Sequence, residues 1–119
     1  MRQKLPDRRY CETFDDVVLG CPATFFMGYG RYVGDGVKEI FVNLSEKSDN
    51  SLLEVMLRDI AIMVSRELQH GSTPEDLAKS LTRDPKGAAA GPAGEVIDVI
   101  IPMNKRIIAE YLAREAEAA

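Results

Sequence analysis

Apolar positions recur along this chain with two different spacings, and each spacing predicts a different element. Between residues 24 and 44 apolar and polar side chains alternate in two runs, T-F-F-M-G-Y-G-R-Y-V and V-K-E-I-F-V-N-L, with G-D-G between them. A period of two is typical of β-strands, and a glycine-rich turn between two such runs indicates a hairpin. Gly34 and Gly36 are expected to supply the positive φ angles of that turn.

A further strand is predicted ahead of the hairpin, over residues 10–19, followed by a break at Gly20-Cys21-Pro22. Within the hairpin both faces carry apolar groups at the end far from the turn. Helices are expected to cover one face of such a sheet. A second subunit is one way to cover part of the other face, and the alternation alone leaves that choice open.

A spacing near 3.6 predicts one long helix over residues 51–70. Gly71 is placed to end it, and either Asp49 or Asn50 is expected to cap its start. On a helical wheel one broad apolar arc is the expected core face: Leu53, Met56, Leu57, Ile60, Met63, Val64 and Leu68. The expected polar side holds Glu54, Arg58, Ser65 and Gln69.

Two apolar residues, Val55 and Ile62, interrupt the polar side of this helix one heptad apart. They are expected to lie either under another element of the same chain or against a second copy. The second interpretation makes the protein a homo-oligomer, with Val55 and Ile62 as the candidate oligomer contacts.

Two further helical segments are predicted in the last third of the chain. Residues 73–81 begin with a capping threonine, a proline in the first turn and two acidic residues near the positive end of the helix dipole. Residues 84–94, rich in proline, glycine and alanine, form a connector. The last helix is expected to start near Glu95, and Pro102 either kinks it or divides it in two.

Together these elements predict a single α+β domain over residues 10–116, preceded by an N-terminal arm over residues 1–9. The expected fold is a small antiparallel three-stranded sheet packed on the long central helix, with two further helical segments. A chain of 119 residues is long enough to bury a core without disulfides or a metal ion.

The charge balance narrows the classes of partner. The net charge of −4 gives no overall positive field to attract nucleic acid or anionic lipid, so nucleic acid is not an expected partner. No apolar run approaches the ~20 residues of a membrane span, and the basic N-terminus lacks the apolar segment of a secretory signal. With only two cysteines in the chain, a reducing, cytoplasmic location is expected.

The charge is nevertheless uneven, because the first nine residues hold Arg2, Lys4, Arg8 and Arg9 against Asp7 alone. A basic arm of this kind is either a solvated chain end or a contact for phosphate or an acidic partner. The sequence does not decide between them.

Residues with catalytic or metal-binding chemistry are few. His70 stands at the predicted helix end, where a histidine interacts favourably with the helix dipole. The spacing of Cys11 and Cys21 matches neither a closed zinc site nor a redox C-x-x-C pair. The glycines between residues 28 and 36 precede a strand and not a helix, so they do not form a phosphate loop. No metal and no cofactor are therefore expected.

Several segments, taken in order, resemble the TSCPD domain. They are L-P-D-R-R (5–9), the F-F-M-G-Y-G-R-Y strand, K-E-I-F-V (38–42), S-R-E-L-Q-H-G (65–71) and P-E-D-L-A-K-S-L (74–81). The resemblance covers roughly residues 5–101. Domains of this family are appended to vitamin-B12-dependent, class II ribonucleotide reductases and also exist as free-standing small proteins.

The chain departs from the family pattern at the signature motif. That motif is expected just before the last helix, where this chain has G-E-V-I-D (94–98). Only Asp98 agrees, and Val96 occupies the cysteine position. After the second hairpin strand, S-E-K-S-D-N replaces the family's glycine-containing turn. A redox or metal role that depends on the signature cysteine is therefore not expected.

The resemblance implies a non-catalytic accessory or binding module linked to deoxynucleotide metabolism. Ribonucleoside-diphosphate reductase activity itself requires a radical cysteine, a reducing cysteine pair and a large protein shell, which this chain does not supply. The implied partner is a ribonucleotide reductase or another nucleotide enzyme. Arg8, Arg9 and Arg31 are candidates to bind a nucleotide-like anion, and Glu39 and Asp98 complete the set of candidate binding residues.

Two other hypotheses remain beside this one. The first is a structural homo-oligomer without ligand chemistry, based on Val55 and Ile62. The second is a small enzyme in which Glu39, Asp98 and His70 meet in a cleft, which requires these three residues to converge in space.

Overall fold

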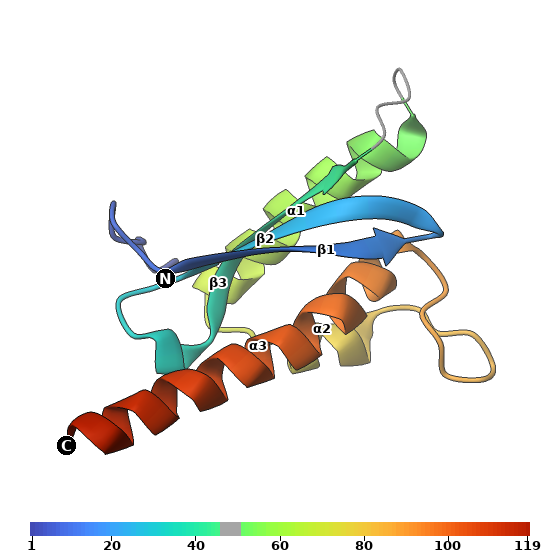
Figure 1. Cartoon of the computed structure of the whole chain (residues 1–119). Helices are drawn as coiled ribbons and strands as arrows, with labels where there is room; N and C mark the ends of the chain where they lie inside the picture. Colours follow the sequence, from blue (N-terminus) through green and yellow to red (C-terminus); the bar gives the residue numbers. More distant parts are fainter. Residues whose placement is uncertain (46–50) are drawn as a thin grey trace.

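The computed structural model describes residues 1–45 and 51–119. Three strands form one antiparallel sheet in the order β1-β2-β3, and the helices lie along it (Figure 1). The strands are β1 (Cys11–Val18), β2 (Cys21–Tyr29) and β3 (Val37–Leu44), and the α-helices are α1 (Leu52–Gln69), α2 (Pro74–Ser80) and α3 (Pro92–Ala118). A 3-10 turn, η1 (Val33–Asp35), lies between β2 and β3. The predicted α+β class and three-stranded antiparallel sheet are confirmed.

β1 and β2 form a hairpin of their own, which the sequence pattern did not predict. Leu19 and Gly20 connect them with φ angles of 48° and 77°. Two consecutive positive φ angles are typical of a tight type I′ hairpin turn. The expected break is therefore confirmed at Gly20 but wrong for Cys21 and Pro22, since β2 starts at Cys21 and Pro22 pairs with Val17.

The connection between β2 and β3 is wider than predicted. Only Gly36 has a positive φ angle, at 90°, so the expectation for Gly34 is wrong. Gly34 is needed for space instead, because a Cβ atom there would lie 2.4 Å from the ring of Tyr32. That ring packs edge-on against Tyr111 of α3, with the ring centroids 5.4 Å apart. The turn is thus held against the C-terminal helix.

The core lies between one face of the sheet and the helices. Phe25, Met27 and Tyr29 of β2 are fully buried, as are Ile97 and Ile100 of α3. The Tyr29 hydroxyl donates a 3.0 Å hydrogen bond to Oδ1 of Asn104, which also accepts from the backbone N–H of Val37. A buried amide oxygen with two donors links α3 to two strands at once.

Helix α1 packs along β3, the edge strand, and buries Leu57, Ile60, Val64 and Leu68 of the predicted core face. The buried arc is shifted around the helix from the predicted one. Ser65 and Gln69, expected on the polar side, are 8% and 6% exposed, whereas Met63, expected in the core, is 60% exposed. The Ser65 hydroxyl donates to the Ile40 carbonyl and accepts from the Ile40 N–H, and Gln69 Nε2 donates to the Lys38 carbonyl. These two polar side chains satisfy backbone groups that an edge strand leaves unpaired, which explains their burial.

The ends and interior of the helices also differ from expectation. Ser51 caps α1 by accepting from the Glu54 N–H, so the expected cap is wrong; Asp49 and Asn50 lie outside the described residues. Helix α3 starts at Pro92 and continues through Pro102 to Ala118 without dividing. Pro102 has no N–H, so one hydrogen bond of the helix is missing at that position.

Candidate functional site

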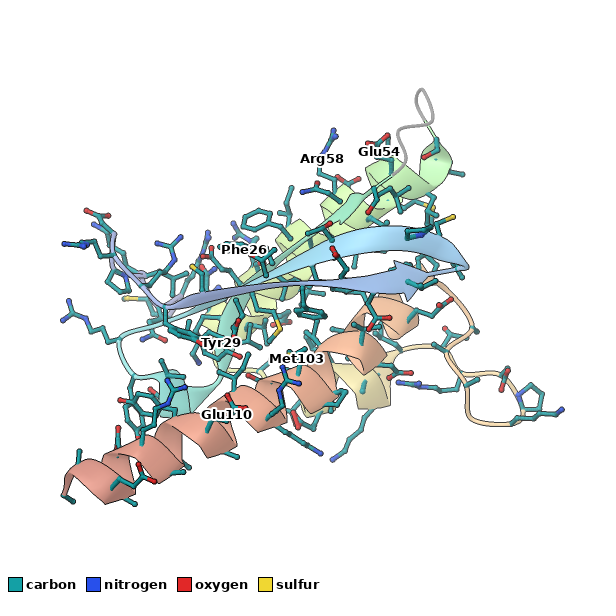
Figure 2. All side chains as sticks on the ribbon, in the orientation of Figure 1. Phe26, Tyr29, Glu54, Arg58, Met103 and Glu110 are labelled. Atoms are coloured by element: carbon teal, nitrogen blue, oxygen red, sulfur yellow. The ribbon has the colours of Figure 1, made fainter. Side chains whose placement is uncertain are left out.

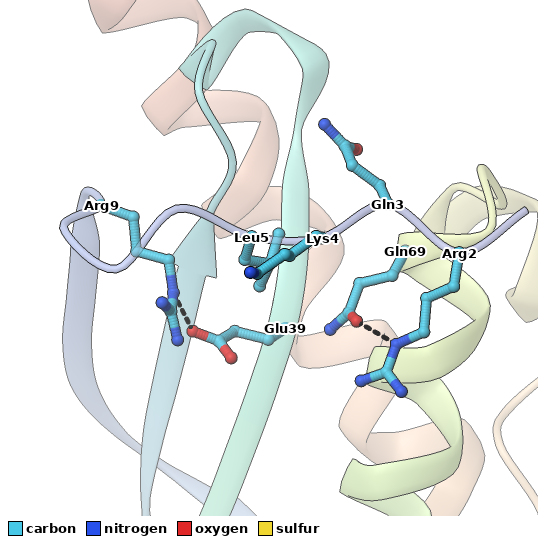
Figure 3. A pocket seen from close by; sticks show the side chains of 7 residues that line it. All are labelled: Arg2, Gln3, Lys4, Leu5, Arg9, Glu39 and Gln69. Carbon is cyan, nitrogen blue, oxygen red and sulfur yellow. Dashed lines mark hydrogen bonds and ion pairs between the residues drawn. The ribbon is translucent and has the colours of Figure 1, made fainter.

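The N-terminal arm crosses β3 and the end of α1 and forms an open cavity with them (Figure 3). We call it the arm cavity; its volume is about 420 Å³. Its lining residues are Arg2, Gln3, Lys4, Leu5, Arg9, Glu39 and Gln69. Five of these seven belong to the arm, so the arm is what turns an open sheet face into a cavity.

Glu39 reaches the cavity because β2 has a glycine beside it. Glu39 of β3 pairs with Gly28 of β2, and Gly28 pairs with Cys11 of β1. A Cβ atom at Gly28 would lie 2.3 Å from Oε1 of Glu39, so the carboxylate occupies the space of the missing side chain. The sheet thus directs Glu39 across its outer face toward the arm.

Arg9 pairs with that carboxylate. Its Nε donates to Glu39 Oε1 at 2.7 Å, and its Nη1 donates to the Pro6 carbonyl at 2.7 Å. The hydrogen bond to Glu39 is the main cause that raises the pKa of Arg9, so the guanidinium stays charged. Burial, and then the charge of Glu39, raises the pKa of the Cys11 thiol, which keeps that thiol protonated and weakly nucleophilic.

Gln69 holds the other end of the arm. Its Oε1 accepts a hydrogen bond from Arg2 Nε, and its backbone carbonyl accepts one from the Gln3 N–H at 2.8 Å. Because Gln69 also donates to β3, one buried residue joins the arm, the helix and the sheet edge. The two ends of the arm cavity, at Arg9 and at Arg2, are therefore both anchored (Figure 3).

The lining carries three cationic side chains, Arg2, Lys4 and Arg9, against the single carboxylate of Glu39. In the hydrogen bonds among the described residues, Arg9 Nη2 and both terminal nitrogens of Arg2 have no partner. Guanidinium groups with free N–H donors bind carboxylate and phosphate oxygens in pairs. The cavity is therefore suited to an anionic group.

The other predicted binding residues lie elsewhere. Arg8 and Arg31 are exposed and do not line the arm cavity. Asp98, in the first turns of α3, makes a two-bond ion pair with Arg83, one bond measuring 2.8 Å. Of the five candidate binding residues, the structure brings Arg9 and Glu39 together and leaves the other three apart.

The hypothesis of a small enzyme required Glu39, Asp98 and His70 to converge, and they do not. Glu39 lines the arm cavity, whereas His70 is exposed beside Met63, Arg66 and Glu67 in a separate depression. Asp98 instead faces Arg83. The three side chains thus have three different surroundings.

The remaining sequence predictions concern the oligomer contacts, the family signature and membrane or metal sites. Val55 and Ile62 are 46% and 50% exposed, so no element of the described chain covers them. Val96, at the signature cysteine position, is fully buried inside α3, so the G-E-V-I-D run lies within the last helix and not before it. Among the described residues, no group of three or more histidine, cysteine or acidic side chains is placed to hold a metal ion. No helix in the same part of the chain is long and apolar enough to cross a membrane.

Sequence reasoning missed Gln69 as a site residue and did not single out Arg2 and Lys4 from the basic arm. One signal for Gln69 was present: Ser65 and Gln69 are four residues apart and border the apolar arc. A polar pair at that spacing fits a helix that lies beside a strand edge. No local sequence pattern indicated that Arg2 and Lys4 would line a cavity with β3 and α1.

The comparison with protein families gave one match. The model of the TSCPD domain family matches residues 3–114, which include most of the arm and the whole sheet. No curated protein matches the chain significantly. No solved structure does so either.

Proposed function

Because this chain belongs to the TSCPD domain family, we propose that it is an accessory binding module of deoxynucleotide synthesis. It acts beside a ribonucleotide reductase and does not itself carry out the reduction. The family match supports this role because it spans almost the whole chain. Within the module, the arm cavity is the proposed binding site.

The charge of that cavity is the observation that indicates the class of ligand. Three cations face a space of about 420 Å³ with one carboxylate among them. The two arginines are already held by Glu39 and Gln69, so their free N–H groups are positioned before any ligand arrives. Prepositioned donors lose less entropy on binding, which favours a di- or triphosphate over a mobile surface contact.

Glu39 adds a second element of recognition. Its Oε1 accepts from Arg9, whereas its Oε2 accepts no hydrogen bond from the described residues. A carboxylate oxygen beside cations suits a ligand that carries a hydroxyl or amino donor next to its phosphates. A nucleotide meets both requirements, since it combines phosphates with sugar hydroxyls.

Isothermal titration calorimetry with ATP, dATP and adenosine tests the binding site. ATP and dATP are expected to bind and adenosine is not. The variant R2Q/K4Q/R9Q is expected to weaken nucleotide binding at least ~tenfold, because it removes every cation of the cavity. The matched control R8Q/R31Q/K105Q removes three cations outside the arm cavity and is expected to keep the wild-type affinity.

Equal losses of nucleotide affinity in the two triple variants would show that net charge alone attracts the nucleotide, and would contradict the proposed binding site. The link to the reductase is tested separately, by affinity purification of the full chain from extracts of the source cell. Repeated failure to recover a ribonucleotide reductase or another nucleotide enzyme would remove the main support for the proposed function.

A further inference from the structure

An exposed apolar surface runs from the outer face of the sheet onto the flank of α1. Four residues define this flank patch: Phe26, Phe41, Val55 and Ile62. Phe41, Val55 and Ile62 are 47%, 46% and 50% exposed. The Phe26 and Phe41 rings lie 5.7 Å apart across β2 and β3, so the sheet part of the patch is continuous.

The sheet part and the helix part of the patch meet in a groove. Phe41 and Ile62 line a cavity of about 340 Å³ together with Val42, Asn43, Glu54 and Arg58. Phe26, Glu54 and Arg58 lie on the same side of the sheet, opposite Tyr29 and the core (Figure 2). Exposed aromatic and aliphatic groups around one groove are typical of an interaction surface.

Two charged side chains beside this groove have no ion-pair partner among the described residues. Glu54 and Arg58 have the i, i+4 spacing that normally gives an ion pair within a helix. The ion pairs among the described residues include neither of them, although Arg106 and Glu110 at the same spacing do pair. The groove therefore presents one negative and one positive side chain, one helical turn apart, each available to a second molecule.

We propose that the flank patch is the interface of a symmetric homodimer in which α1 packs antiparallel to α1 of a second copy. A two-fold axis on the Glu54–Arg58 side of α1, level with residue 56, places Glu54 of each copy opposite Arg58 of the other. Both ion pairs form at once, because the two residues lie at equal distances along the helix on either side of that axis.

The same axis also brings the apolar groups together. Val55 is one residue from the level of the axis along α1, so the two copies of Val55 come close to each other near the axis. The outer sheet faces lie on the same side of the paired helices and approach each other, which covers Phe41 and Phe26. A second copy thus complements the charges of the groove and covers Val55, Phe41 and Phe26 without any further component.

Light scattering coupled to size-exclusion chromatography, without nucleotide, tests the dimer. The wild-type chain is expected to have twice the 13.2 kDa mass of one chain. The single variants Glu54→Arg and Arg58→Glu each place like charges opposite one another, and are expected to weaken dimerisation at least ~tenfold. Met63→Glu changes an exposed residue of α1 outside the patch and is expected to leave the dimer intact.

Mixing the two single variants gives the decisive result. One chain then carries two arginines and the other two glutamates, so both opposed pairs become attractive and a heterodimer is expected. Misfolded chains would not regain a dimer on mixing, so the result also controls for folding. A monomeric wild type, or a mixture that stays monomeric, would overturn the proposal. Neither result bears on nucleotide binding in the arm cavity.

Discussion

The two faces of the sheet are built from the same three strands and have opposite contents. On the inner face Phe25, Met27 and Ile40 are fully buried under the helices. On the outer face the row Cys11-Gly28-Glu39 is polar and supports the arm, and Phe41 is 47% exposed. The inner face therefore holds the fold together, and the outer face is free to carry binding.

This division has a physical cause in the order of the elements. All three α-helices follow the last strand, and α1 runs beside β3 with its apolar arc turned toward the inner face. The outer face is left to the short N-terminal arm, which covers only the end that contains Glu39 (Figure 3). Variants that change one face or the other test how complete the division is.

The largest expected effect comes from matching truncations on the two faces. Phe25→Ala is expected to lower the free energy of unfolding by about 3–5 kcal/mol, because it leaves a cavity in the core. Phe41→Ala removes the same atoms from a half-exposed position and is expected to cost under about 1 kcal/mol. Urea denaturation at concentrations too low for self-association measures both. Similar losses would show that the outer face also contributes to the core.

A smaller effect is expected where the arm meets the sheet. Gly28→Ala puts a Cβ atom on the Glu39 carboxylate, which must move away from Arg9, at an expected cost of about 1–3 kcal/mol. The arm should then become sensitive to limited proteolysis near Arg9. Gly30→Ala is the control, since its nearest contact would be an ordinary 3.6 Å. Equal protease sensitivity in the two variants would contradict this role of Gly28.

At the β3 edge, Ser65→Ala is expected to lower the free energy of unfolding by about 1–2 kcal/mol, because the buried Ile40 N–H and carbonyl lose their hydrogen-bond partner. Hydrogen exchange of the Ile40 amide should accelerate in this variant. Ser80→Ala, at an exposed position of α2, is the control and should change neither quantity. An unchanged exchange rate of the Ile40 amide would mean that water replaces the hydroxyl as its partner.

The smallest effect near neutral pH concerns Tyr29 on the inner face. Burial is the main cause that raises the pKa of Tyr29 above its usual value near 10. Above that pH the unfolded chain loses the phenolic proton while the folded chain keeps it, so stability falls as the pH rises, by at most about 1.4 kcal/mol per pH unit. Urea denaturation between pH 9 and 11 should show a shallower fall for Tyr29→Phe than for the wild type. Tyr32→Phe, outside the core, should follow the wild type more closely.

Local patterns predicted the parts of the fold whose causes are local. The alternation around Phe25 and Met27 identified the strands, and the predicted cap of α2 by Thr73 is confirmed. Ser65 and Gln69 were predicted on the polar side of the helix but are buried. A helical wheel contains no information about neighbouring elements, here the edge of β3. Their polarity is useful only in that tertiary setting.

The candidate site was harder to predict than the fold, because its contacts join distant parts of the chain. Arg9 and Glu39 were each singled out, yet nothing in the sequence indicated that they pair with each other. The hydrogen bond from the Gln3 N–H to the Gln69 carbonyl joins the arm to the end of α1. Backbone contacts of this kind leave no trace in residue type, so the arm cavity is visible only in the structure.

Because α1 covers the edge strand β3, the sheet is protected from growing into a fibre by repeated strand addition. A sheet grows into a fibre only if each added molecule offers a fresh edge for the next one. Here Ser65 and Gln69 occupy one edge, which leaves β1, with Asp15 and Asp16 on it, as the only open edge in the described sheet. Two molecules joined through β1 would have no edge left to offer. Strand addition between folded copies therefore stops at two, and an extended fibre requires α1 to leave the sheet first.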